Sequence, residues 1–247
     1  MKIVPLSEGS FTIDQTKVFV PFDTDKDILN ERPRGSLLVE IQPFVVQTAT
    51  DTILIDTGLG FSYNETMQLH SNLKSNNIDP ASVTKVLLSH LHKDHAGGIS
   101  WMNNEREELS FSNATYYVHE KEIAFALEKG MPSYDIKDFE ILINNLQLQI
   151  FTGESGNINA QIYYDVCGGH CPYHTVFKIV EDDQIIFYGG DVAPQLEQMK
   201  RKIMAKYDFD GRKSMELRLK WLEMGEKEGW TFLFFHDIKT PFFKFSV

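Results

Sequence analysis

Four potential metal ligands fall within six residues in His90-Leu91-His92-Lys93-Asp94-His95, between the apolar run Val86-Leu87-Leu88 and Ala96-Gly97-Gly98. The nitrogen and oxygen donors of His and Asp suit zinc, manganese, iron or cobalt better than calcium or magnesium. Alternate residues of a strand point to opposite faces, so His90 and His92 can turn toward one ion while Asp94 and His95 turn toward a second. The spacing therefore predicts a loop that binds two metal ions.

A structural role is the alternative, because a single histidine is more often a surface or hydrogen-bonded core residue than a ligand. Three imidazoles packed this closely would repel one another once protonated and would contribute little as core. The density of the cluster favours the metal site.

Three further strand-like runs end on a histidine or an aspartate. Residues 161–164 lead into Asp165-Val166-Cys167-Gly168-Gly169-His170, residues 184–188 into Gly189-Gly190-Asp191, and residues 231–235 into His236-Asp237. Taken singly, each is compatible with a turn or a structural histidine. Together with the first cluster they add His170, Asp191 and His236 to the candidate ligands.

In this order the motifs resemble those of the metallo-β-lactamase superfamily: His-x-His-x-Asp-His, a distant His, a distant Asp and a last His. The resemblance covers nearly the whole chain. It includes Ile53-Leu54-Ile55-Asp56-Thr57-Gly58, similar to the family's first motif, and Gly169-His170-Cys171-Pro172-Tyr173-His174-Thr175, similar to its Gly-His-Thr-Pro-Gly-His-Thr segment. Cys171 and Tyr173 stand where Thr and Gly are usual.

The resemblance implies two metal-binding groups and a carboxylate that bridges them: His90, His92 and His170; Asp94, His95 and His236; and Asp191 between the two. We expect two divalent ions, zinc first, with manganese, iron and cobalt as alternatives. Two cations roughly 3.5 to 4 Å apart lower the pKa of a shared water and polarise a substrate oxygen. The implied reaction is hydrolysis by a bridging hydroxide, with Asp94 and Asp191 as the catalytic residues.

Other polar residues are assigned supporting or structural roles. In the resembling family Asp56 braces the metal loop, whereas a turn cap is the alternative from the residues alone. His174 is interpreted as a buried supporting residue. His70 and His119 lie in helix-like polar segments and are expected to be exposed to solvent.

Length and composition favour one globular domain. The 247 residues are 42% hydrophobic and 24% charged, and the ligand set extends from His90 to His236, so we expect a single domain over residues 1–247 with a β-rich extension at residues 1–50. Cys167 and Cys171 form no disulfide framework or zinc ribbon and are interpreted as loop thiols. The beginning of the chain lacks the apolar core of a signal peptide, which favours a cytoplasmic setting, and no run is long enough for a membrane helix.

The charge balance argues against nucleic acid as a partner. The chain has 24 basic and 35 acidic residues, a net charge of −11, and no basic run longer than Lys200-Arg201-Lys202. Proteins that neutralise phosphates usually carry a basic stripe. The expected partner is a small-molecule substrate.

The order of predicted elements indicates an α/β fold. Strands are predicted at residues 11–13, 17–20, 36–46, 52–55, 85–88 and 114–118, and helices at residues 65–76, 120–128, 136–145 and 212–226. Strands followed by helices, twice, with residues 52–60 and 184–193 as weakly similar halves, predict a four-layer αββα sandwich.

Two segments have open interpretations. Residues 23–34 are polar and follow the apolar residues 18–22, which indicates a mobile lip over the metal site, a homodimer contact or a pocket wall, with an ordinary core strand as the alternative. Residues 242–245 allow the same alternatives.

The motifs fix a reaction type but not a substrate. Lactonases of the resembling group commonly have a Tyr three residues after the bridging Asp, and Pro194 occupies that position here. We predict ester or lactone hydrolysis, with thioester hydrolysis of the glyoxalase II type as the alternative. A persulfide dioxygenase with one iron, or a noncatalytic module, would be expected to lose ligands, and all seven are present.

Overall fold

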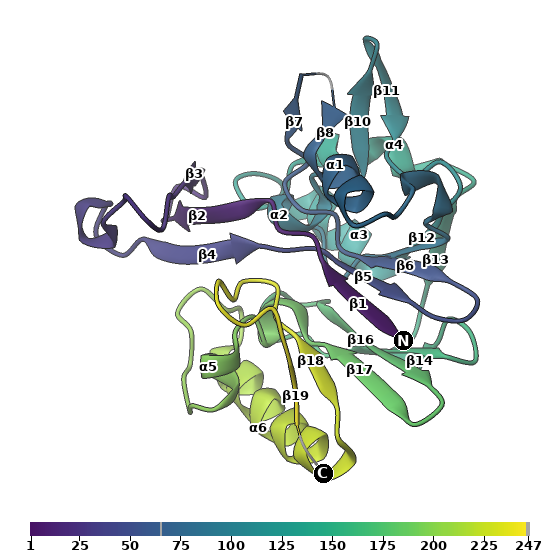
Figure 1. Ribbon diagram of the computed structural model, residues 1–247. Helices are drawn as coiled ribbons and strands as arrows, with labels where there is room; N and C mark the ends of the chain where they lie inside the picture. The colour runs from purple at the N-terminus through teal and green to yellow at the C-terminus, as the bar shows by residue number, and fades with distance from the viewer. Residues whose placement is uncertain (65, 246–247) are drawn as a thin grey trace.

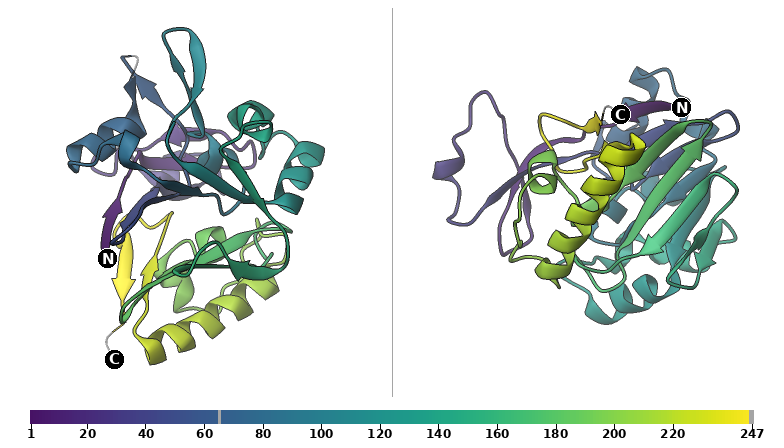
Figure 2. Two further views of the ribbon diagram at one scale, coloured as in Figure 1. Left: turned by 90° about the vertical axis from the view of Figure 1, so that its right-hand side faces the viewer. Right: turned by 90° about the horizontal axis from the view of Figure 1, so that it is seen from below.

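Two six-stranded sheets lie face to face, and helices cover the outer side of each (Figures 1 and 2). The computed structural model describes residues 1–64 and 66–245. The order of layers is helix, sheet, sheet, helix. The predicted αββα sandwich is therefore confirmed.

The first sheet has the strand order β1-β5-β6-β9-β12-β13. β5 pairs antiparallel with β1 and β6, whereas β6, β9, β12 and β13 are parallel. The strands are β1 Lys2–Pro5, β5 Phe44–Gln47, β6 Thr52–Ile55, β9 Lys85–Leu87, β12 Thr115–His119 and β13 Leu148–Phe151. The helices on its side are α1 Gln68–Ser75, α2 Lys93–Ala96, α3 Glu120–Lys129 and α4 Glu140–Ile143.

The second sheet has the order β14-β15-β16-β17-β18-β19 and is antiparallel except between β17 and β18. Its strands are β14 Ser155–Asn157, β15 Ile162–Val166, β16 Thr175–Glu181, β17 Gln184–Tyr188, β18 Thr231–Leu233 and β19 Phe242–Lys244. Parallel neighbours need a long crossover. The chain between β17 and β18 supplies it with α5 Leu196–Met199 and α6 Gly211–Glu228.

Smaller elements lie around the sandwich. β2, β3 and β4 form a separate sheet that projects from it in Figure 1. These elements are β2 Gly9–Ile13, β3 Phe19–Pro21, β4 Leu37–Ile41, β7 Ser62–Tyr63, β8 Thr66–Met67, β10 Ser100–Asn103 and β11 Arg106–Leu109, with 3-10 helices η1 Leu29–Glu31, η2 Pro80–Ser82, η3 Ile136–Asp138 and η4 Gly190–Val192. Residues 1–50 are thus divided between this projecting sheet and strands β1 and β5 of the main sheet. Residues 23–34 connect β3 to β4.

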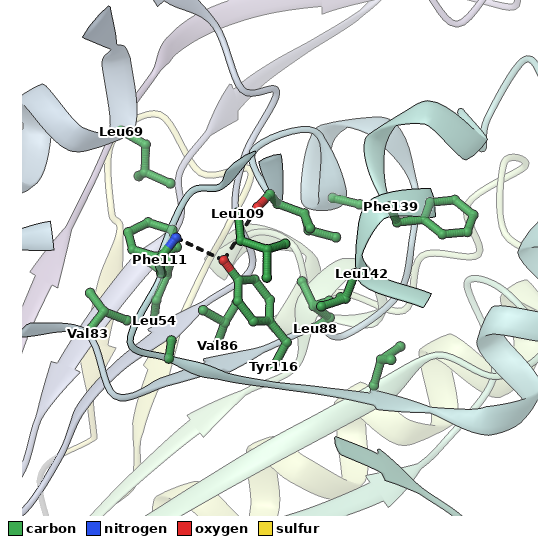
Figure 3. Close-up of a cluster of buried hydrophobic side chains, with 14 of the residues drawn as sticks. Leu54, Leu69, Val83, Val86, Leu88, Leu109, Phe111, Tyr116, Phe139 and Leu142 are labelled. Atoms are coloured by element: carbon green, nitrogen blue, oxygen red, sulfur yellow. Dashed lines mark hydrogen bonds between the residues drawn. The ribbon is translucent and has the colours of Figure 1, made fainter. Parts of the chain in front are cut away.

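Alternation along the strands produces three cores between the four layers. On β6, Leu54 points to the core beneath the helices of the first half (Figure 3), while Ile53 and Ile55 point to the core between the sheets. The second sheet repeats this pattern, because Ile186 faces the first sheet and Phe187 faces α6. Both sheets are therefore buried on two faces.

Three predicted elements differ from the structure for local reasons. The strand expected over residues 36–46 breaks into β4 and β5 around Gln42-Pro43, where proline lacks the N–H that a ladder requires. The helix expected over residues 136–145 is interrupted at Phe139, which has φ −134° and ψ −1° and buries its ring in the core. Of the helix expected over residues 65–76, residue 65 lies outside the described part of the chain, Thr66–Met67 form β8, and α1 begins at Gln68.

The long helix and the C-terminal aromatic segment have clear positions. α6 packs Trp221, Leu217 and Met224 into the core against the second sheet, as its periodicity predicted. Residues 242–244 form β19, the edge strand beside β18. Among the described residues, no helix combines the length and apolar character needed to cross a membrane.

Gly225 tests how tightly α6 packs on the second sheet. A Cβ at this position would lie 2.2 Å from the buried ring of Phe232. We predict that Gly225→Ala lowers the free energy of unfolding by about 1–3 kcal/mol, because overpacking outweighs the gain in helix propensity. Urea denaturation measures the change, and Glu226→Ala at the exposed neighbouring position is the control. Equal or greater stability of Gly225→Ala would contradict this packing.

Candidate metal centre

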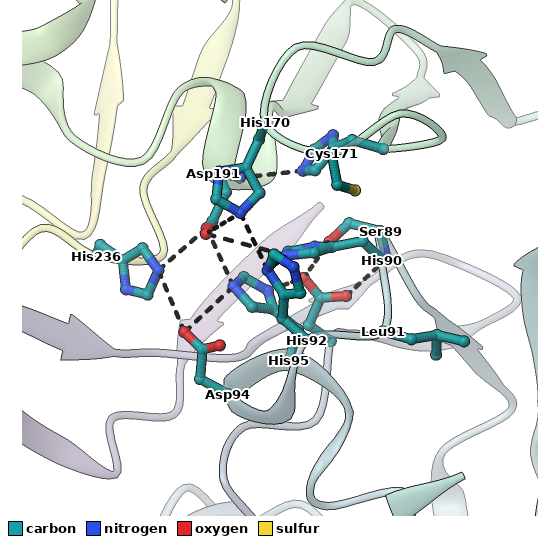
Figure 4. A network of polar contacts seen from close by, with 12 residues as sticks. Ser89, His90, Leu91, His92, Asp94, His95, His170, Cys171, Asp191 and His236 are labelled. Atoms are coloured by element: carbon teal, nitrogen blue, oxygen red, sulfur yellow. Dashed lines mark hydrogen bonds and ion pairs between the residues drawn. The ribbon is translucent and has the colours of Figure 1, made fainter. Parts of the chain in front are cut away.

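The seven candidate ligands, far apart in sequence, meet where strand ends of the two sheets face each other (Figure 4). One cluster follows β9 of the first sheet, and the other ligands follow β15, β17 and β18 of the second. The residues brought together are His90, His92, Asp94, His95, His170, Asp191 and His236.

The first group contains three imidazole nitrogens that converge. His92 Nδ1 lies 2.9 Å from His90 Nε2 and 3.1 Å from His170 Nε2. Asp191 Oδ2 lies 3.3 Å from His170 Nε2 and 4.0 Å from His90 Nε2. Four donor atoms thus surround a small common space.

The second group contains two imidazoles and two carboxylates. Asp94 Oδ2 lies 3.6 Å from His95 Nε2 and 3.5 Å from His236 Nε2. Asp191 Oδ1 lies 3.0 Å from His95 Nε2 and 3.1 Å from His236 Nε2. The two oxygens of Asp191 therefore face different groups, in the arrangement that a bridging ligand needs.

The hydrogen bonding and the chemical type of these donor atoms are those expected of a metal site. His95 Nε2 and Asp191 Oδ1 are buried and form no well-aligned hydrogen bond, although buried polar groups normally have one; they meet only in the close ion-pair contacts between the candidate ligands. The donor set of imidazole and carboxylate is the one that divalent transition metals and zinc prefer. The clusters indicate a dinuclear site for divalent metal ions.

Burial and neighbouring charges shift the pKa values of the candidate ligands in opposite directions. Burial, together with the other histidines, holds the pKa values of His90 and His92 well below their usual range. Burial also opposes charge on His95, but Asp191, Asp94 and Asp56 raise its pKa well above the usual value. Asp191 has a pKa well below its usual range because the attraction of His236, His95 and His170 outweighs its burial. A cation in either group would displace these protons and take over the pairing with Asp191.

Acceptors behind the ligands orient several rings. The Nδ1 atoms of His95, His236 and His170 face Asp56 Oδ2 at 2.8 Å, the Glu40 carbonyl at 2.8 Å and Asp208 Oδ1 at 3.1 Å. Since each partner is an acceptor, Nδ1 keeps a proton, and Nε2 is the nitrogen that would bind a metal ion.

Asp56 is the most heavily bonded of these acceptors. It is fully buried, and its carboxylate accepts hydrogen bonds from the Ser89 N–H at 2.8 Å, the Ser89 hydroxyl at 2.7 Å, His95 at 2.8 Å and the Tyr188 hydroxyl at 2.5 Å. Asp56 therefore supports the ligand loop and does not act as a turn cap.

Two glycines allow the close approach of backbone in this region. A Cβ on Gly98 would lie 2.2 Å from the Thr57 carbonyl oxygen, and one on Gly190 would lie 2.5 Å from His174 Nε2. Gly190 also has φ +49°, which disfavours other residues. His174 Nε2 accepts a hydrogen bond from the Asp191 N–H at 3.1 Å, so His174 fixes the backbone of Asp191 from a fully buried position.

The expectation that His70 and His119 are exposed to solvent is wrong. His70 is buried, donates to the Ser110 carbonyl at 2.7 Å and packs against Trp101 and Phe111. His119 is buried and its Nδ1 accepts from the Lys121 N–H as the N-cap of α3.

Three polar residues near the candidate ligands were not predicted from the sequence. Asp208 contacts His170, and the buried Glu122 accepts from the Leu91 N–H at 3.0 Å within the ligand loop. Glu8 is buried and accepts from the Leu59 N–H at 2.6 Å. None of the three residues belongs to a recognisable sequence motif, so nothing in the neighbouring sequence indicated their positions. Cys167 and Cys171 are buried free thiols.

Asp191→Ala tests the bridging position. Removal of the carboxylate that faces both groups takes away the charge shared by the two cations, so we predict the loss of at least one metal ion per chain. Elemental analysis after dialysis measures the content, with Asp165→Ala at an exposed position of β15 as the control. Full retention of both ions by Asp191→Ala would count against a bridging role.

Asp56→Asn tests the support behind His95. An asparagine amide keeps one acceptor oxygen, but its NH₂ faces donors where the second carboxylate oxygen accepts, and the negative charge beside His95 is lost, so the support of the His95 ring is weakened. We predict that zinc affinity falls about 10- to 100-fold. Competition with a chromophoric chelator measures the dissociation constant, and thermal unfolding checks that the variant is folded. Unchanged affinity in a folded variant would refute this role.

A protein-family model described as "Metallo-beta-lactamase superfamily" matches residues 40–236 of the chain. Among curated proteins, the chain is 29% identical over 187 residues to lactamase-like protein nscB of Aspergillus fumigatus, covering 72% of this chain and 48% of that protein. It is 26% identical to atrochrysone carboxyl ACP thioesterase of the same species (67% and 44%) and 31% identical to N-acyl homoserine lactonase AttM of Azorhizobium caulinodans (44% and 40%). The chain spans about half the length of the curated relatives it matches.

Solved structures share the fold. A probable metal-dependent hydrolase from Staphylococcus aureus superimposes with a TM-score of 0.76 at 21% identity, covering 99% of this chain and 92% of that one. The dizinc quorum-quenching lactonase AidC superimposes with a TM-score of 0.69 at 19% identity (97% and 88%). With the family match over residues 40–236 and the ligand geometry, these findings show that the chain belongs to the metallo-β-lactamase superfamily.

Proposed function

We propose that this chain is a dinuclear metal-dependent hydrolase that cleaves an ester or lactone bond of a small molecule. His90, His92 and His170 would hold one ion, Asp94, His95 and His236 the other, and Asp191 would bridge them, with zinc as the expected metal. When bound, two such ions activate water near neutral pH and polarise a carbonyl oxygen.

The observation that carries this proposal is the position of Asp191. Its two oxygens face two separate sets of nitrogen donors, at 3.3 Å from His170 and 3.0 Å from His95. A centre with one ion would need only one of these sets. The arrangement therefore supports a dinuclear hydrolase over the alternative of a dioxygenase with one iron.

Asp94 is the proposed catalytic base. It lies at the N-terminal turn of the short helix α2, and Oδ2 is about equally far from His95 and His236, while the residue retains some exposure at the site. From this position its carboxylate would orient the attacking water and accept its proton.

Relatives support the choice of bond without fixing the substrate. AttM is named as a lactonase, and AidC is described as a dizinc lactonase. The thioester alternative has a specific observation in its favour, because another relative is named as an acyl-carrier-protein thioesterase. Esters, lactones and thioesters share an acyl carbon that water attacks, so one centre is suited to all three.

The test is a panel of substrates with the zinc-loaded protein: N-hexanoyl-homoserine lactone, 4-nitrophenyl butyrate, S-butyryl-N-acetylcysteamine and bis(4-nitrophenyl) phosphate. We predict the highest kcat/KM for the lactone or the ester. Removal of metal with 1,10-phenanthroline should abolish turnover, and added zinc should restore it.

Three outcomes would contradict the proposal. A preference for the phosphodiester or the thioester would reassign the bond. Turnover that survives complete metal removal would exclude the metal-dependent reaction. Purified protein with one iron per chain that consumes oxygen with glutathione persulfide would assign the dioxygenase instead.

A further inference from the structure

Residues 200–210 lie beside the His170 ligand although they contain no ligand themselves. The Phe209 N–H donates to the His170 carbonyl at 3.0 Å, and the Asp210 N–H donates to the Gly169 carbonyl at 2.7 Å. Asp208 Oδ1 lies 3.1 Å from His170 Nδ1. The backbone and a side chain of this segment thus hold it against the metal centre.

Tyr207 extends from this segment toward the same ligand. Its ring centroid lies 6.0 Å from that of His170 with the planes at 65°, and 37% of the residue is exposed, so it lies at the solvent-facing rim of the centre. A tyrosine phenol is protonated at neutral pH and is a hydrogen-bond donor.

The oxygen of the Tyr207 hydroxyl accepts a hydrogen bond, whereas its proton has no acceptor among the described residues. Gln198 Nε2 donates to it at 3.3 Å. Within residues 1–64 and 66–245, no group accepts the phenol proton. Since a phenol donates one hydrogen bond, this donor remains for a molecule that enters the site.

A buried arginine keeps the segment in place relative to Asp191. Arg218 on α6 is 1% exposed, and its Nη1 donates to the Val192 carbonyl at 2.8 Å, while Nη2 donates to the Ile203 carbonyl. Val192 follows the bridging aspartate, and Ile203 begins the part of the segment that carries Tyr207. One side chain thus connects both, which preorganises the phenol.

We propose that the Tyr207 phenol donates a hydrogen bond to the carbonyl oxygen of the substrate and stabilises the negative charge that develops there. This inference rests on the proposed acyl hydrolysis. It assigns the donor to a segment different from Pro194, the position three residues after Asp191, which has no side-chain donor. Donors aimed at a developing oxyanion are among the largest contributions to acyl-transfer catalysis.

Tyr207→Phe is the decisive variant, because it removes the hydroxyl and keeps the ring that packs near His170. We predict that kcat for the preferred ester or lactone falls about 10- to 100-fold while KM changes less than about threefold, because the bond is strongest in the transition state. Zinc content and thermal unfolding temperature should match those of the wild type. Tyr163→Phe removes a half-exposed phenol on β15, bonded only to the Ala160 carbonyl, and should leave all values unchanged.

A second measurement does not depend on turnover. Butylphosphonic acid presents a tetrahedral anion like that of the transition state, and isothermal titration to the zinc-loaded proteins measures its dissociation constant. We predict that Tyr207→Phe weakens binding at least about tenfold, as expected for one lost charge-assisted hydrogen bond, and that Tyr163→Phe has no effect.

The outcomes separate this inference from the proposed function. Wild-type kcat and wild-type phosphonate affinity in Tyr207→Phe would overturn the role of the phenol and leave the hydrolase intact. A loss of zinc in the variant would make Tyr207 a structural support of His170 and would also overturn the inference. If the wild type cleaves no ester or lactone, the proposed function fails, while the ratio of phosphonate affinities still tests the hydrogen bond.

Discussion

A single buried carboxylate, Asp56, fixes the relation between the two sheets at the point where the ligands converge. It receives hydrogen bonds from the ligand loop after β9, through Ser89 and His95, and from the second sheet, through Tyr188 at the end of β17. A charge at this depth is tolerated only when it is fully hydrogen-bonded, so these four contacts are obligatory. Because His95 and Asp191 follow the same two strands, the carboxylate that joins the sheets also sets the spacing between the metal-binding groups.

The metal-free geometry explains why cations suit this site. His90 and His92 are buried with pKa values well below the usual range, so both rings are neutral, and His90 Nε2 lies 2.9 Å from His92 Nδ1. In the second group, despite the burial of His95, Asp191 and Asp94 raise its pKa well above the usual value. Divalent ions would replace protons in the second group and bind the imidazole nitrogens of the first, so folding and metal binding are expected to be strongly linked.

The sequence singled out the seven side chains that converge because they follow hydrophobic strands and carry motifs, as at His170 and Asp191. The residues that support and complete the site were not predictable in this way. Asp208 and Tyr207 lie in an irregular segment with no periodicity, and their positions depend on Arg218, which comes from the later helix α6. His70 was misassigned because the aromatic side chains that bury it, Trp101 and Phe111, lie 31 and 41 residues further along the chain. The predicted boundaries of the helix over residues 136–145 were wrong because burial of the Phe139 ring outweighs helix propensity at that position.

Anomalous diffraction from crystals of the zinc-loaded protein, recorded above and below the zinc edge, would locate the metal ions themselves. We predict two peaks roughly 3.5 to 4 Å apart, with Asp191 in contact with both and the other six candidate ligands divided between them as the two groups described above. A single peak, or peaks away from these seven side chains, would contradict this prediction.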